Sequence, residues 1–130
     1  MTGFTVEKLE NFPALLATWL PDFEFGKHAQ NYSVSVQNAL NEQTDPVFYI
    51  MDMTPNDKMS FQELIEGSSM AARGSNPNFH HPMVQGVLLV TKNIATQAAA
   101  KGLKSDTFGN VNAHVFTSLD DALAFVQKNS

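Results

Sequence analysis

A polar turn after the apolar stretch VFYIMDM holds the side chains best suited to chemistry. Asp52 lies near the end of that stretch, and Ser60 opens the pattern SFQE at the start of a helical segment. This pattern matches a capping box, in which the serine and glutamate side chains each bond the other residue's backbone N–H. A helix start also suits a phosphate group, because its free N–H groups and its dipole favour an anion. Ser60 is therefore interpreted as a helix cap, with phosphorylation as the functional alternative.

The same region could bind a partner or a ligand. Methionines gather in one third of the chain, and methionine serves both as a core filler and as an adaptable binding surface. Core packing is the simpler interpretation, but loops 53–60 and 76–83 could instead cover a pocket for a small apolar ligand. The predicted binding residues are Asp52, Thr54, Asn56, Asp57, Met59, Ser60, Phe79 and Met83.

Other reactive patterns in the chain have simpler explanations. GSSMA approaches the nucleophile pattern Gly-x-Ser-x-Gly, but it lies in a helical segment rather than after a strand. His80 and His81 are adjacent, so in an extended segment their side chains point to opposite sides. The chain has no cysteine and no glycine-rich phosphate motif. We therefore predict no catalytic residues, no metal and no cofactor.

Length and charge limit the class of protein. The chain has 130 residues and a net charge of −5 with scattered basic residues, which argues for one domain and against a nucleic-acid partner. The N-terminus lacks the pattern of a signal peptide, and the apolar runs are too short to span a membrane. We predict a cytoplasmic protein. A short edge strand, a lightly charged surface and exposed phenylalanines or Trp19 would support a homodimer.

The hydrophobic periodicity alternates between strands and helices, which predicts an α/β fold with a mainly parallel sheet and an antiparallel N-terminal hairpin. Ligands in such sheets bind at the carboxyl ends of the strands. Three junctions qualify: Asp52 to Ser60, Thr91 to Asn93, and Phe116 to Ser118. The predicted strands are 4–10, 13–20, 47–53, 84–91 and 111–117, and the predicted helices are 26–42, 60–73, 93–103 and 118–129.

The element order and several stretches resemble the STAS domains, the regulatory modules of anti-sigma-factor antagonists and anion transporters, and their small lipid-pocket relatives. The resemblance rests on VFYIMDM, the helix opening at Ser60, VQGVLLVT and AHVFTSLDDALAFV. It implies reversible phosphorylation at Ser60, or at Thr54 as the alternative. The turn MTPNDKMS is longer than that of the antagonists and lacks glycine, so the single-domain relatives are the closer match. The resemblance implies a non-enzymatic regulatory domain that binds a protein partner or a small apolar ligand.

Overall fold

The computed structural model describes residues 3–56, 62–63, 66, 78–101 and 112–129. The predicted strands are confirmed to within a few residues, and so are three of the predicted helices. The fourth predicted helix, 60–73, lies mostly outside the described residues. Along the chain the elements are β1 (Phe4–Lys8), β2 (Ala14–Trp19), α1 (Phe25–Asn41), β3 (Val47–Asp52), the 3-10 helix η1 (Asn78–His80), β4 (Val84–Val90), α3 (Ile94–Lys101), β5 (Ala113–Phe116) and α4 (Leu119–Lys128).

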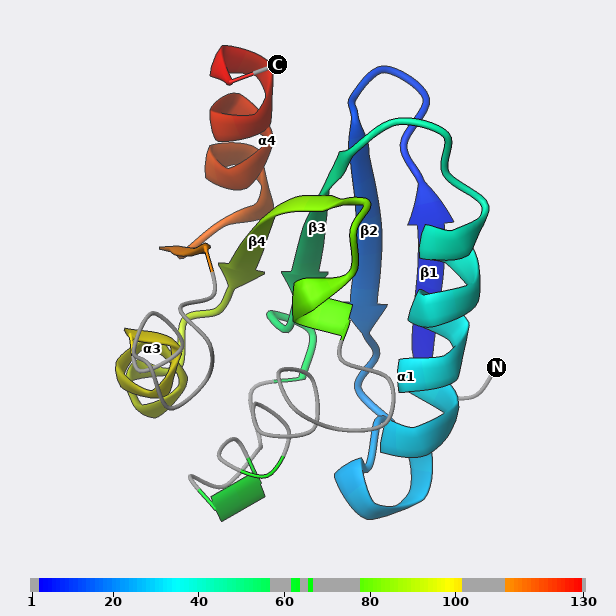
Figure 1. Cartoon of the computed structure of the whole chain (residues 1–130). Coiled ribbons are helices and arrows are strands. Elements are labelled where there is room, and N and C mark those ends of the chain that lie inside the picture. The colour runs from blue at the N-terminus through cyan, green and yellow to red at the C-terminus, as the bar shows by residue number, and fades with distance from the viewer. Residues whose placement is uncertain (1–2, 57–61, 64–65, 67–77, 102–111, 130) are drawn as a thin grey trace.

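The five strands form one mixed sheet in the order β1-β2-β3-β4-β5 (Figure 1). β1 pairs antiparallel with β2, whereas β2, β3, β4 and β5 all run parallel. The α/β class and the antiparallel hairpin at one edge are therefore confirmed. Because four strands are parallel, their carboxyl ends share one edge, which lies toward the bottom of Figure 1.

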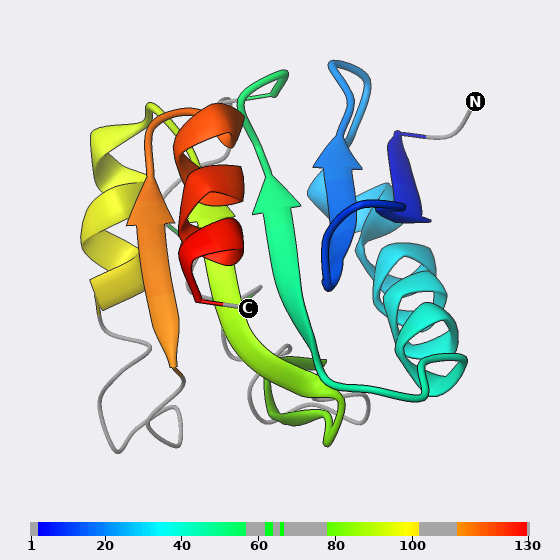
Figure 2. The same cartoon turned by 90° about the horizontal axis from the view of Figure 1, so that it is seen from above.

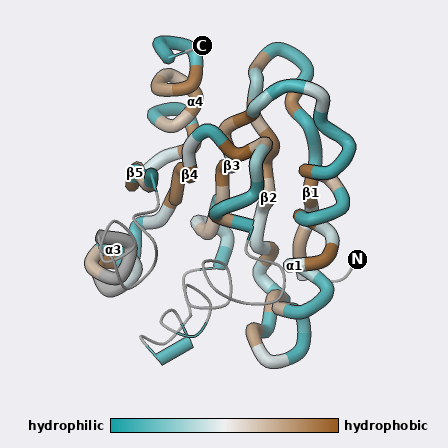
Figure 3. Tube along the Cα trace, viewed as in Figure 1, coloured by the Kyte–Doolittle hydropathy of each residue, from teal (hydrophilic) through white to brown (hydrophobic). Residues whose placement is uncertain are grey.

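Helices cover both faces of the sheet, with α1 and α4 on opposite sides (Figure 2). The face under α1 carries the odd-numbered residues of β2 and β3, such as Leu15 and Tyr49, and the face under α4 carries the even-numbered ones, such as Leu16 and Ile50. β3 is buried along its whole length, as a continuous apolar run predicts for a strand covered on both faces. Figure 3 shows the hydrophobic residues concentrated on the central strands.

The two core layers differ in composition. The layer under α4 is built from aliphatic and phenyl side chains, including Val126 and Leu88. The layer under α1 also buries hydroxyl groups: the Tyr32 and Tyr49 oxygens lie 2.5 Å apart and share a hydrogen bond. Burial raises the pKa of Tyr32 to about 12 and raises that of Tyr49 well above its usual value. Both phenols are therefore neutral structural groups at ordinary pH.

Trp19 was expected to be exposed, and that prediction is wrong. Its side chain is buried at 6% exposure, stacked on Phe23 with ring centroids 4.3 Å apart. The alternation of β2 turns Trp19 toward the α1 layer, where it also meets the edge of Tyr32. It therefore gives no support to the predicted homodimer, which stays a prediction. Among the described residues, no helix combines the length and apolarity needed to cross a membrane.

Candidate functional site

Asp52 is the last residue of β3, as predicted; it is also buried, and the hydrogen bonds of its side chain are local. Its Oδ1 accepts hydrogen bonds from the Thr54 backbone N–H at 3.0 Å and from the Thr54 hydroxyl at 2.7 Å. This arrangement closes the turn after the strand, since a carboxylate commonly bonds the backbone two residues onward. Asp52 thus positions the turn, and Thr54 already uses its hydroxyl within it.

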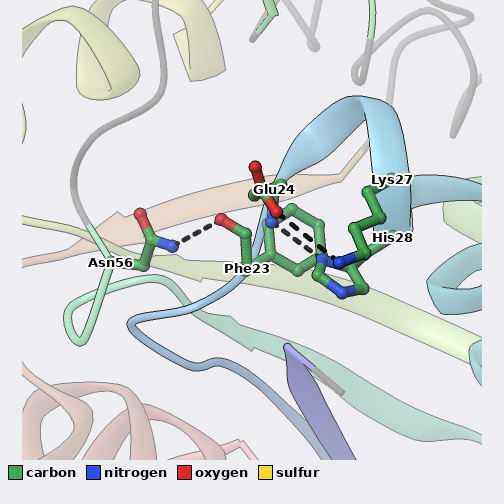
Figure 4. Close-up of polar contacts among 5 residues, drawn as sticks. All are labelled: Phe23, Glu24, Lys27, His28 and Asn56. Atoms are coloured by element: carbon green, nitrogen blue, oxygen red, sulfur yellow. Dashed lines mark hydrogen bonds and ion pairs between the residues drawn. The ribbon is translucent and has the colours of Figure 1, made fainter.

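Asn56 connects this turn to the segment that follows β2. Its side chain is buried, and its Nδ2 donates to the backbone oxygen of Phe23 at 2.9 Å (Figure 4) and to that of Leu20 at 3.0 Å. The two segments are far apart in sequence, but both lie at the carboxyl edge of the sheet. A buried amide bonded to two carbonyls is costly to remove, because the Phe23 carbonyl would lose this bond, while the Leu20 carbonyl would keep only its bond from the Phe23 N–H. Asn56 was predicted as a binding residue, and the structure gives it the role of holding two loops together.

A hollow of about 570 Å³ lies where these two loops meet. This volume falls in the usual range for ligand sites. The hollow combines acidic side chains with two phenyl rings and with backbone from the first turn of α1. Its lining residues are Pro21, Asp22, Phe23, Glu24, Phe25, Gly26, Lys27, Asn56 and Glu63.

The charge around the hollow is negative. Asp22, Glu24 and Glu63 carry carboxylates and Lys27 carries an ammonium; Glu63 has an interaction of its own, so the balance rests on Asp22, Glu24 and Lys27. Lys27 Nζ lies 3.9 Å from Glu24 Oε2, and both side chains are mostly exposed, so this ion pair contributes little to stability. The start of α1 adds only about half a positive charge. Asp22 and Glu24 exceed Lys27 by one negative charge, which outweighs the half charge of the helix dipole, so the hollow suits a cation better than a phosphate.

The first turn of α1 forms one wall of the hollow, and its N-cap residue is Glu24. The Glu24 side chain makes no capping bond. Instead the Glu24 backbone N–H donates to His28 Nδ1 at 2.9 Å, so a ring from the next turn satisfies the start of the helix (Figure 4). His28 is buried and lies against Phe23, with ring centroids 5.6 Å apart.

Sequence reasoning missed the segment 20–27. It considered the junctions after the later strands, but β2 runs parallel to β3, so its carboxyl end lies at the same edge. A signal was present in PDFEFGK, where acidic residues alternate with phenylalanines directly after a strand. The other predicted junctions form helix caps: Ser118 Oγ accepts from the Asp121 N–H, and Asn93 Oδ1 accepts from the Thr96 N–H.

The remaining predicted binding residues divide into two groups. Asp57, Met59 and Ser60 lie outside the described residues, so the phosphorylation of Ser60 stays a prediction. Phe79 is packed in the core layer under α1, in agreement with the core interpretation, and Met83 is partly buried before β4. The pocket beneath loops 53–60 and 76–83 also stays a prediction, because both loops include residues that are not described.

His81, predicted as part of a simple loop pair, has both ring nitrogens bonded. Its Nδ1 accepts the Met83 N–H at 3.0 Å, and its Nε2 lies 2.7 Å from Asn41 Oδ1 at the end of α1. Burial lowers the pKa of this imidazole. His81 therefore joins the segment before β4 to α1 and acts as a structural residue.

We compared the chain with protein-family models, curated proteins and solved structures. No family model matches the chain, and no curated protein or solved structure matches it.

Proposed function

We propose that this chain is a non-enzymatic recognition domain that binds a cationic side chain, an arginine or a lysine of a partner protein, in the hollow at the carboxyl edge of its sheet. The single observation that carries the proposal is the lining of the hollow, which contains acidic residues and two phenylalanines. A guanidinium or an ammonium gains both from carboxylates and from the face of an aromatic ring. The proposal keeps the regulatory, partner-binding character that the STAS resemblance implies.

The placement of the loops supports binding in preference to catalysis. Asn56 holds the two loops together through backbone carbonyls, which gives the hollow a fixed wall. Phe23 is buried and Phe25 is partly exposed, whereas Asp22 and Glu24 are exposed, so apolar surface and accessible carboxylates occur together in the lining. The candidate acid–base groups nearby already have structural bonds, Asp52 to Thr54 and His28 to the Glu24 N–H.

Short synthetic peptides that carry one arginine among glycines and serines would test the proposal, with glutamate replacing arginine in the control peptide. Trp19 is the only tryptophan and is stacked on Phe23, so its fluorescence reports on the hollow directly. We expect the arginine peptide to bind with an affinity that falls with added salt, and the glutamate peptide not to bind. Equal binding of the two peptides, or no binding of either, would contradict the proposal.

Matched substitutions sharpen this test. Asp22→Asn removes one carboxylate and should weaken binding by about two- to fivefold, whereas Lys27→Gln removes the competing cation and should strengthen it by a similar factor. Asp45→Asn is the control, because it makes the same charge change in an exposed residue before β3, at the amino ends of the strands. If Asp22→Asn and Asp45→Asn have the same effect, binding depends on net charge and not on the hollow.

A further inference from the structure

His28 holds the rim of the hollow through a bond that depends on its charge. Its Nδ1 accepts the Glu24 N–H at 2.9 Å, and the ring is buried at 8% exposure. A ring nitrogen that accepts an N–H carries no proton, so the observed bond requires the neutral imidazole with its proton on Nε2. If Nδ1 carried a proton, its N–H would point at the Glu24 N–H, and neither donor would have an acceptor there.

The ring has little room to adjust within the closed structure. Gly3 approaches it from the start of β1, and a Cβ built on Gly3 would lie only 2.8 Å from His28 Nδ1. Gly3 is fixed in turn, because its carbonyl accepts the Leu20 N–H at 2.9 Å. Phe23 also lies against the ring. A protonated ring therefore has to leave this position rather than shift within it.

The surrounding charges favour departure of the protonated ring. The charged groups nearest along the chain are Asp22, Glu24 and Lys27, and Tyr32 one turn later stays neutral because burial raises its pKa to about 12. Gly3, which directly precedes β1, also meets the ring, and it has no ionisable side chain. The positive end of α1 opposes an imidazolium in the buried position, whereas the exposed carboxylates of the rim would stabilise one that swings outward.

We propose that His28 is a positioning residue and that its protonation opens the rim of the hollow, so that the hollow is formed when the imidazole is neutral. Histidine is the side chain whose ordinary charge change falls between about pH 5 and 8, while carboxylates and guanidinium groups keep their charge over most of that range. As a consequence, which rests on the proposed function, the domain would release a cationic segment on mild acidification.

The decisive variant is His28→Asn. The asparagine Oδ1 can take the place of Nδ1 as acceptor for the Glu24 N–H, but it cannot be protonated. In the ligand-free protein, we expect wild-type Trp19 fluorescence and the protection factor of the Glu24 amide, which is the intrinsic exchange rate at each pH divided by the observed one, to change between about pH 7.5 and about pH 5.5, and the variant to keep the high-pH values throughout. His81→Asn, at the other end of α1, is the matched control and should behave as wild type in these two readouts.

Gly3→Ala provides a second variant, since its Cβ should displace the ring without a change of pH. We expect it to show the fluorescence and rapid Glu24 exchange of the open rim already at about pH 7.5. If wild type and His28→Asn give the same pH curves, the inference is wrong, whether or not any peptide binds. Loss of the Glu24 protection on acidification in wild type alone supports it, even if the arginine peptide fails to bind and the proposed function falls.

With the arginine peptide as the probe, we expect wild-type affinity to fall about fivefold over the same acidification, which is the usual contribution of one hydrogen bond. His28→Asn should bind equally at both pH values. Equal pH dependence of binding in the two proteins would overturn the link between His28 and the hollow.

Discussion

α1 and α4 both follow a parallel strand at the same edge of the sheet, but their first turns are built differently. Ser118 caps α4 by accepting the Asp121 N–H at 3.2 Å, and Asp120 and Asp121 face the positive end of the helix. α1 has no side-chain cap from its N-cap residue and no acidic residue in its first turn. Its first free N–H is satisfied by a histidine one turn further on.

The two helix starts therefore differ in whether their acidic side chains stabilise the helix or remain accessible to a ligand. At α4, neighbouring residues supply both the capping bond and the acidic side chains of the first turn, so these charges stabilise the helix. At α1 the carboxylates of Asp22 and Glu24 remain exposed around the hollow, and the helix start depends on His28 and on contact with Gly3. A helix start built from distant parts is easier to disturb, and that property suits a binding site that opens and closes.

The largest expected effect tests this dependence on distant contacts. Gly3 has φ of 80°, a conformation that favours glycine, and a Cβ there would meet His28 Nδ1 at 2.8 Å. We expect Gly3→Ala to lower the free energy of unfolding by about 3 kcal/mol, from backbone strain and overpacking together. Gly26→Ala is the control: it lies in the first turn of α1 with no atom within 4 Å of the added Cβ, and should stabilise by about 0.5 kcal/mol. Equal effects in denaturant titrations would show that α1 does not depend on β1.

The same contrast extends to the core layers, because only the layer under α1 buries a tyrosine pair among the described residues. The folded-state pKa of Tyr32 is about 12, above its usual value of 10, so its contribution is complete below pH 10 and is lost as the pH rises through 12. We expect a loss of about 2 kcal/mol by pH 12 from Tyr32 alone. Since Tyr32 and Tyr49 are the only tyrosines, tyrosinate absorbance should stay absent near pH 10 and appear only with unfolding or near pH 12. Tyrosinate at the usual pH without unfolding would show that the pair is accessible.

The two helix starts can be compared directly by truncating their N-cap side chains. Ser118→Ala removes a bond to a backbone N–H and should cost about 1 kcal/mol. Glu24→Ala removes a side chain that makes no capping bond and should change stability by less than about 0.5 kcal/mol. Thermal unfolding of the two variants measures the difference. A similar loss in both would mean that Glu24 stabilises α1 through its charge.

The elements with strong local patterns were predictable from the sequence. The periodicity of β3 and α4, the cap at Ser118 and the position of Asp52 at a strand end all depend on neighbouring residues. The hollow was not predictable in the same way, because it depends on the pairing of β2 with β3 across the α1 crossover and on the bond from the Asn56 side chain to Phe23. Sequence patterns do not specify which loops meet at one edge until the direction of each strand is known.

The bond of His28 was also beyond sequence reasoning. A histidine on the inner face of a helix is usually a core residue, and only the geometry shows its Nδ1 against a backbone N–H. Gly3 gives a second example, since its need for glycine comes from contact with a ring far along the chain. Local chemistry predicted the bounds of both helices and the cap of α4, but it did not predict the contacts at the start of α1, which come from residues distant in sequence.

The smallest expected effect concerns the other end of α1, where His81 also accepts a backbone N–H through Nδ1 and meets Asn41 through Nε2. Burial lowers its folded-state pKa below 6.5, so the unfolded chain binds the proton more readily. The contribution of His81 to the free energy of unfolding is therefore complete above about pH 6.5. It is lost as the pH falls through the lowered pKa, and it amounts to less than about 1 kcal/mol. His81→Asn, which keeps an acceptor, should remove this part of the acid sensitivity in denaturant titrations while leaving Trp19 fluorescence unchanged. If His81→Asn instead abolished the pH response of Trp19, the two ends of α1 would act as one unit, and the contrast between its start and that of α4 would extend to the whole helix.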